Sequence, residues 1–207
     1  MGKLLRPKIS KKLIGLGDSH LDNFTFFCAA TCRVPGATAY GLTNPNSDTR
    51  AREAFLGFLS SFPNYIPLLC IGEVDCNSLP WRVESSISPE DVIHCSIDRL
   101  FRFLKETKIH FILPSVTLPP VDLYSDINSR LHVSAGKQER TILVNLYNNL
   151  LKENISKTNH TYLDLTTPTT GPDGLVDKHF IRSTSDVHLA SDKVYPIVRD
   201  LLDSVNL

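Results

Sequence analysis

The chain has 207 residues, 42% of them hydrophobic, and its 22 basic side chains balance its 22 acidic ones. This length and composition are typical of one globular domain spanning residues 1–207, and they exclude a disordered or strongly charged protein. With no net charge and no basic run beyond residues 3–12, the sequence lacks the electrostatic signature of nucleic-acid binding.

The sequence also lacks export signals. Its amino-terminal residues have no apolar secretory core, and no stretch reaches the roughly 18 apolar residues that a membrane span requires. The five cysteines are odd in number and scattered, which favours buried free thiols over a disulfide framework. We therefore expect a soluble, cytoplasmic protein.

Short apolar stretches alternate with segments of helical periodicity. The stretches predict β-strands at residues 13–17, 31–36, 66–72, 109–114 and 161–165. Helical spacing predicts helices at residues 49–62, 88–104, 137–157 and 191–203, with a short helix or a loop at 21–30. Strands that alternate with helices indicate a parallel sheet covered on both faces.

Three segments carry finer signals. Residues 88–91 begin a helix with serine at the cap, proline at the first position and acids in the first turn. The loop at residues 115–134 is long for a compact domain, so we expect it to face a substrate. The helix at 137–157 is predicted to turn one apolar face inward, made of Ile142, Leu143, Leu146, Leu150 and Ile155.

The first predicted strand stops at a glycine and is followed by Asp18, Ser19 and His20. Ligand sites in α/β proteins lie at the carboxyl ends of parallel strands, so Ser19 is the candidate nucleophile. A serine hydroxyl needs a base to take its proton. His188 precedes the last helix, and Asp186 beside it can fix the tautomer of an imidazole base.

Four blocks occur in a characteristic order: Gly17-Asp18-Ser19-His20, a second block led by Gly36, Gly72-Glu73-Val74-Asp75, and Asp186-x-His188. This arrangement resembles the SGNH/GDSL hydrolase family of esterases and lipases over nearly the whole chain. The resemblance implies a flavodoxin-like three-layer α/β/α sandwich with a central, mostly parallel five-stranded sheet. It also implies an acyl-serine intermediate with Ser19 as nucleophile and His188 as base, and neither a metal nor a cofactor.

The resemblance further implies an oxyanion hole with three donors. These are the N–H of Ser19, a glycine N–H of the second block and an asparagine of the third block. Gly36 fits the second donor, with Gly41 as the alternative. Val74 stands at the asparagine position, and loss of one such donor typically costs about 10²–10³ in rate.

The third block is similar to a carbohydrate-associated branch of the superfamily that has Gly-Glu-Ile/Val-Asp-Cys. By this resemblance Glu73, Asp75 and Cys76 line the site together with Asp18 and His20. Glu73 and Asp75 could also serve as turn or helix-capping residues.

The fourth block departs from the usual Asp-x-x-His spacing, which would place the acid at Ser185. Three arrangements therefore stay open. Asp186 supports His188, a backbone carbonyl supports it instead, or Ser19 and His188 act as a dyad without a third group.

The predicted function is a serine esterase that hydrolyses or transfers an acyl group, such as acetyl, on a carbohydrate or another small ester. The alternative is a weakly active or inactive SGNH-like domain that binds a glycan or a protein. Asp18-x-His20 also resembles the opening motif of calcineurin-like metallophosphoesterases, but the Gly-Asn-His block of that family is absent from the sequence.

Overall fold

The computed structural model describes residues 12–81, 87–122 and 135–205. Its strands are β1 (Leu13–Gly17), β2 (Ala30–Arg33), β3 (Ile66–Cys70), β4 (Ile112–Pro114) and β5 (Thr161–Leu163). They form one sheet in the order β2-β1-β3-β4-β5, and every neighbouring pair is parallel. This is the flavodoxin-like strand order, so the predicted fold class is confirmed.

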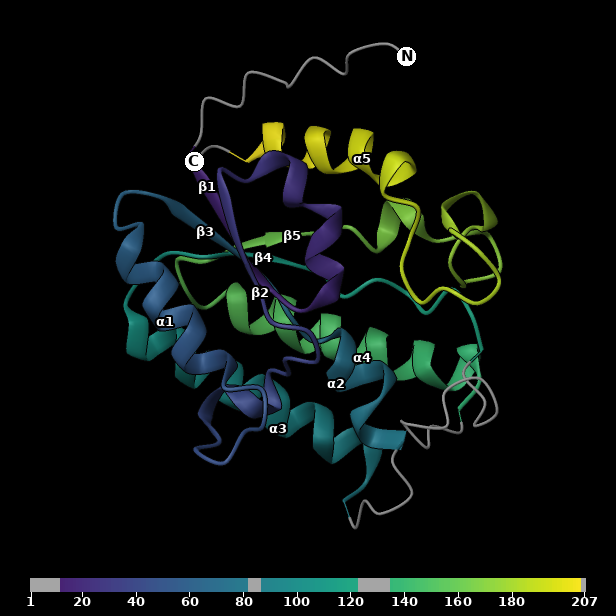
Figure 1. Cartoon of the computed structure of the whole chain (residues 1–207). Coiled ribbons are helices and arrows are strands. Elements are labelled where there is room, and N and C mark those ends of the chain that lie inside the picture. The colour runs from purple at the N-terminus through teal and green to yellow at the C-terminus, as the bar shows by residue number, and fades with distance from the viewer. Residues whose placement is uncertain (1–11, 82–86, 123–134, 206–207) are drawn as a thin grey trace.

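The helices are α1 (Ala51–Ser61), α2 (Glu73–Asn77), α3 (Pro89–Thr107), α4 (Lys137–Ile155) and α5 (Ser191–Ser204). Helix α5 covers one face of the sheet, and α1, α3 and α4 cover the other (Figure 1). Two short 3₁₀ helices, Ser19–Asn23 and Thr25–Phe27, follow β1. The chain therefore has the three layers expected from the alternating pattern.

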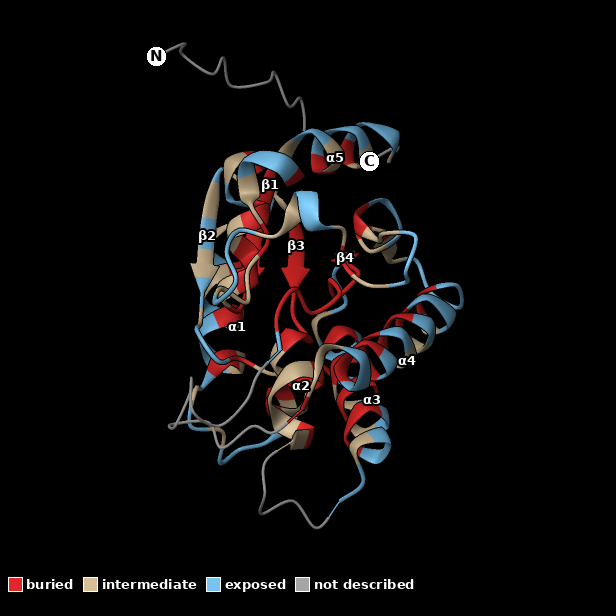
Figure 2. Cartoon of the chain, turned by 90° about the vertical axis from the view of Figure 1, so that its right-hand side faces the viewer, coloured by how far each residue is buried: buried red, intermediate tan, exposed pale blue. Residues whose placement is uncertain are grey.

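Burial follows the position of each strand in the sheet. All five residues of β1 and four of the five in β3 are buried, because both strands are covered on both faces. Strand β2 lies at the edge and is only partly buried. Figure 2 shows the buried residues gathered in the central strands and on the inner sides of α3 and α4.

Helix α3 begins as the sequence predicts, because the Ser88 hydroxyl accepts a hydrogen bond of 3.1 Å from the Asp91 N–H. The inward face of α4 differs from the prediction: Ile142 is 65% exposed. The buried face instead carries Arg140 and Asn148 beside Leu143, Val144, Tyr147 and Leu151. Leu143 and Ile155 are buried as predicted, and Leu146 and Leu150 pack partly buried against the core. An apolar count missed the polar part of this face, because hydrogen bonds allow polar side chains to be buried there.

The strand order reverses at β1, which pairs with β2 on one side and β3 on the other. Ligands bind α/β sheets outside the carboxyl ends of the strands at such a switch point. Part of the loop predicted to face a substrate, residues 123–134, lies outside the described residues. No helix among the described residues combines the length and apolar character needed to cross a membrane.

Candidate active site

Three side chains from opposite ends of the sequence meet at the carboxyl ends of the strands. His188 Nε2 lies 2.9 Å from Ser19 Oγ, and His188 Nδ1 lies 2.8 Å from Asp186 Oδ1. A carboxylate only accepts hydrogen bonds, so Nδ1 carries the proton and Nε2 is free to accept from the serine hydroxyl. The geometry is that of a nucleophile, a base and a group that orients the base.

The loop before α5 presents Asp186 and His188. A bridge between Ile181 and Leu189 closes this loop, and Asp186 Oδ1 also accepts the backbone N–H of His188 at 2.9 Å. Burial alone would raise the pKa of Asp186, but hydrogen bonds from His188 and the charges of His188 and Arg182 lower it. Asp186 is therefore ionised at neutral pH.

Ser19 begins a 3₁₀ helix directly after β1, where the backbone passes close to β3. A side chain at Gly17 would clash with the carbonyl oxygen of Cys70, so only glycine fits there. Asp18 is fully buried, and its Oδ1 accepts the His20 N–H at 2.8 Å. Asp18 thus caps the short helix that carries Ser19.

His20 is buried between two carboxylates and stacks on the ring of His188. The ring centroids of the two histidines are 4.5 Å apart. His20 Nδ1 lies 3.3 Å from Asp18 and Nε2 lies 3.8 Å from Glu73. Burial alone would lower the pKa of His20, but the charges of Glu73 and Asp18 and a hydrogen bond to Asp18 raise it to about 9. His20 is therefore a cation at neutral pH.

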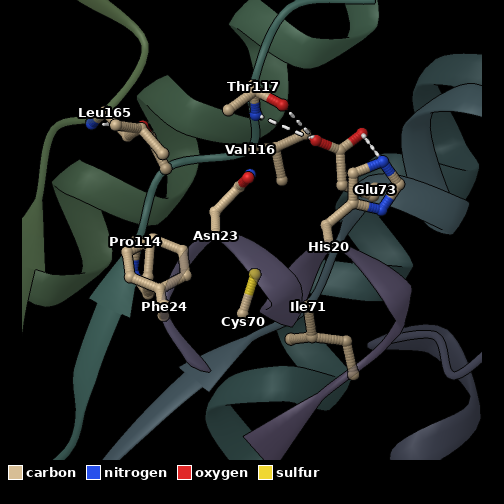
Figure 3. Close-up of a pocket in the computed structure, with 11 residues that line it drawn as sticks. His20, Asn23, Phe24, Cys70, Ile71, Glu73, Pro114, Val116, Thr117 and Leu165 are labelled. Carbon is tan, nitrogen blue, oxygen red and sulfur yellow. Dashed lines mark hydrogen bonds and ion pairs between the residues drawn. The ribbon is translucent and has the colours of Figure 1, made fainter. Parts of the chain in front are cut away.

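Glu73, the first residue of α2, is held on both oxygens. Its Oε1 accepts from Thr117 N at 3.1 Å and Thr117 Oγ1 at 2.6 Å, and its Oε2 accepts from Asn77 Nδ2 at 2.6 Å. Figure 3 shows Glu73 between Thr117, from the loop after β4, and His20, from the loop after β1. Glu73 thus ties three strand ends together.

Asp75 is fully buried and fixes the segment after Gly36. Its Oδ2 accepts the Ala39 N–H at 2.8 Å, and its Oδ1 accepts the Tyr40 N–H at 2.9 Å and the Ser96 hydroxyl at 2.7 Å. Burial raises the pKa of Asp75 to about 6, against the hydrogen bonds, which lower it. Asp75 was expected to line the site, but its carboxylate supports the neighbouring loop instead.

The expected oxyanion-hole glycines differ in their backbone roles. Gly36 has φ +76°, a left-handed conformation that favours glycine. Gly41 already uses its N–H on Thr38, donating to the hydroxyl at 2.9 Å and to the carbonyl at 3.1 Å. Gly36 is consequently the better candidate of the two.

A cavity of about 240 Å³ opens beside Ser19. It is lined by Ser19, His20, Glu73, Val74, Asn77, Ser78, Pro119, Pro120, Arg140 and Val187. Three of the residues that the sequence placed at the site, Ser19, His20 and Glu73, reach this cavity. Sequence reasoning missed Asn77 and Arg140. The signal for Asn77 was its place one helical turn after Val74, at the spacing that puts two side chains on one face.

Cys76 was expected to line the site but lies in the core. It is fully buried, and its Sγ points to the Leu143 carbonyl at 4.0 Å. Burial raises the pKa of its thiol well above the usual value, so it is an unreactive side chain. Asp18 also stays behind the cavity as a helix cap. Within the described part of the chain, no group of three or more His, Cys, Asp or Glu side chains is arranged to hold a metal ion.

No protein-family model and no curated protein sequence matches this chain. Solved structures do match. A GDSL-like lipase from Bacteroides thetaiotaomicron is 17% identical, with a TM-score of 0.60 over 97% of this chain and 90% of that protein. The acetyl xylan esterase AlAXEase is 16% identical, with a TM-score of 0.53 over 95% of this chain and 100% of that protein. The chain therefore shares the fold of the GDSL-type hydrolases.

Proposed function

We propose that the protein is a serine esterase that removes a short acyl group, such as acetyl, from a carbohydrate or another small ester. The observation that carries this proposal is the chain of two hydrogen bonds, of 2.9 and 2.8 Å, that joins Ser19, His188 and Asp186. The similarity in fold to an acetyl xylan esterase and a GDSL-like lipase is consistent with ester chemistry.

In the proposed reaction Ser19 Oγ attacks the ester carbonyl while His188 Nε2 takes the hydroxyl proton. The backbone N–H groups of Ser19 and Gly36 stabilise the oxyanion. His188 then returns the proton to the leaving alcohol, and an acyl-serine remains. Water, activated by the same imidazole, releases the acid. A second alcohol in place of water would give acyl transfer.

One observation favours a second candidate, a domain that binds a glycan or a protein without catalysis. Val74 lines the cavity at the position where the resemblance requires an amide donor. Removal of one oxyanion donor typically costs about 10²–10³ in rate, so a chain without a substitute would be a poor catalyst.

Labelling with a fluorophosphonate probe, together with hydrolysis of 4-nitrophenyl acetate, tests the esterase proposal. We expect wild-type protein to be labelled and active, and Ser19→Ala to lose labelling. Ser19→Ala and His188→Ala should each lower kcat by about 10³–10⁶, and the double variant should lose little more, because the two residues act as a unit. Wild-type protein that is neither labelled nor active would favour the binding domain.

A further inference from the structure

The cavity beside Ser19 has one wall formed by a fixed amide. Asn77 lies at the end of α2 and lines this cavity, with Glu73 and Arg140 on either side of its side chain. Glu73 is 5% exposed and Arg140 is 1% exposed, so two nearly buried charged residues converge on a more exposed neutral one.

The network allows only one orientation of the amide. Asn77 Nδ2 donates to Glu73 Oε2 at 2.6 Å, and Asn77 Oδ1 accepts from a guanidinium nitrogen of Arg140 at 3.3 Å. A guanidinium only donates and a carboxylate only accepts, so exchanging the two ends of the amide would place like groups against each other. The oxygen therefore faces Arg140 and the nitrogen faces Glu73.

Both neighbours are themselves anchored. Thr117 holds the other oxygen of Glu73 with two hydrogen bonds, and Arg140 also donates to the Val121 carbonyl. Among the hydrogen bonds of the described residues, Asn77 uses one of two Nδ2 hydrogens and one of two Oδ1 lone pairs. The amide thus keeps one donor and one acceptor for a ligand.

Charge around the cavity narrows the chemistry of that ligand. Glu73 borders the cavity and disfavours an anionic group, whereas Arg140 and His20 disfavour a cationic one. A hydroxyl is neutral and both donates and accepts, which matches the two free positions of the amide. An alkyl group would leave those positions buried without partners, and that is costly.

We propose that Asn77 binds a free hydroxyl group of the substrate close to the ester, and so selects hydroxylated esters over plain alkyl esters. This proposal rests on the proposed function. The hydroxyl belongs either to the alcohol part or to the acyl part of the ester, since both leave the reacting carbonyl within reach of the cavity.

Three small esters separate these sources: propyl acetate, 2,3-dihydroxypropyl acetate and propyl glycolate. The second adds hydroxyls to the alcohol part, and the third adds one to the acyl part. We expect the wild-type kcat/KM for one of the two hydroxylated esters to be about tenfold higher than that for propyl acetate, which is the effect of one or two neutral hydrogen bonds. The ester that is preferred shows which part of the substrate carries the hydroxyl. Asn77→Leu, which keeps the size but removes both polar atoms, should bring the ratio close to one.

The ratio of kcat/KM values cancels any loss that affects all esters equally, so it separates recognition from general damage. Asn77→Ser is a second variant, whose shorter hydroxyl cannot span the same gap, and its ratio should also fall. Asn64→Leu is the matched control, because Asn64 is exposed before β3 at the opposite edge of the sheet. Its ratio should equal that of the wild type.

Two results overturn the role of Asn77 while the esterase proposal stands. One is a labelled, active wild-type enzyme with equal kcat/KM for all three esters. The other is a preference that survives in both Asn77→Leu and Asn77→Ser. Wild-type protein that neither reacts with the fluorophosphonate nor hydrolyses any ester overturns both proposals.

Discussion

The two stacked histidines belong to regions of opposite character. On one side, the side chains of His188 and Asp186 are 25% and 27% exposed in the loop before α5. On the other, those of His20 and Glu73 are 10% and 7% exposed, and that of Asp18 is fully buried, at the ends of β1 and β3. In the proposed reaction, the open region holds the groups that exchange protons with the substrate. The buried region holds the groups that fix their positions.

This difference predicts what a substitution does on each side. Exposed polar contacts contribute little to folding, so changes in the open region should affect activity and leave stability nearly unchanged. Buried polar groups are costly when a partner is lost, so changes in the buried region should lower stability first.

Asp186→Asn tests the open side and has the largest expected effect of the substitutions that compare the two regions. An asparagine amide can present an N–H to His188 Nδ1, which favours the wrong tautomer of the base. We expect kcat/KM for 4-nitrophenyl acetate to fall about 10²–10⁴. The melting temperature should change little, because the carboxylate is partly solvated.

The matched control for this variant is Asp200→Asn, an exposed acid on α5 paired with Arg199. It should retain wild-type activity. A loss of less than tenfold in Asp186→Asn would show that Ser19 and His188 work as a dyad, and the open region would then contain only two essential groups.

Asp75→Asn tests the buried side. Asp75 accepts hydrogen bonds on both oxygens, from Ala39, Tyr40 and Ser96. An asparagine has only one acceptor oxygen, and its amide N–H would face the backbone N–H of Ala39 or Tyr40. Two donors would then point at each other, and the backbone N–H would lose its acceptor. We expect the free energy of unfolding, measured with urea, to fall by about 2–3 kcal/mol.

Ser96→Ala is the graded comparison, because it removes only the hydroxyl donor to Asp75 and should cost about 1 kcal/mol. Equal and small effects of both substitutions would show that the segment after Gly36 holds itself in place. The contrast between the open and buried regions would then be weaker than the burial suggests.

The open region could be predicted from the sequence, whereas most of the buried region could not. Ser19 follows a buried strand, and His188 and Asp186 precede the last helix, so the alternating pattern alone brings them to one edge of the sheet. Both long central helices follow from the same periodicity. These features depend on local pattern and on chain order, whereas the strand order was expected only from the resemblance to the SGNH/GDSL hydrolases.

Buried polar side chains depend on partners far away in the sequence. The burial of Arg140 on α4 could not be predicted, because it depends on the hydrogen bonds that its guanidinium donates to Asn77 and Val121. The spacing of Asn77 from Val74 is informative only once residues 73–77 are known to form a helix, and the sequence indicated only a turn or helix caps there. Cys76 was misplaced for the same reason, since the helix turns it towards α4. Tertiary pairing therefore decides what a local pattern leaves open.

The pH dependence of stability tests the contact between the two regions, at His20. The pKa of His20 is about 9 in the folded protein and about 6.5 when unfolded, so its stabilisation is complete below pH 6.5 and is lost as the pH rises through 9. Between pH 6.5 and 8.5 the free energy of unfolding of the wild type should fall by about 2 kcal/mol more than that of His20→Gln. Urea unfolding at both pH values measures this difference. The buried thiols begin to ionise in the unfolded chain near pH 8.5, but both proteins share them, so their contribution cancels. Parallel pH profiles of the two proteins would mean that Asp18 and Glu73 do not hold a cation against His188, and that the buried region fixes the catalytic loop by packing alone.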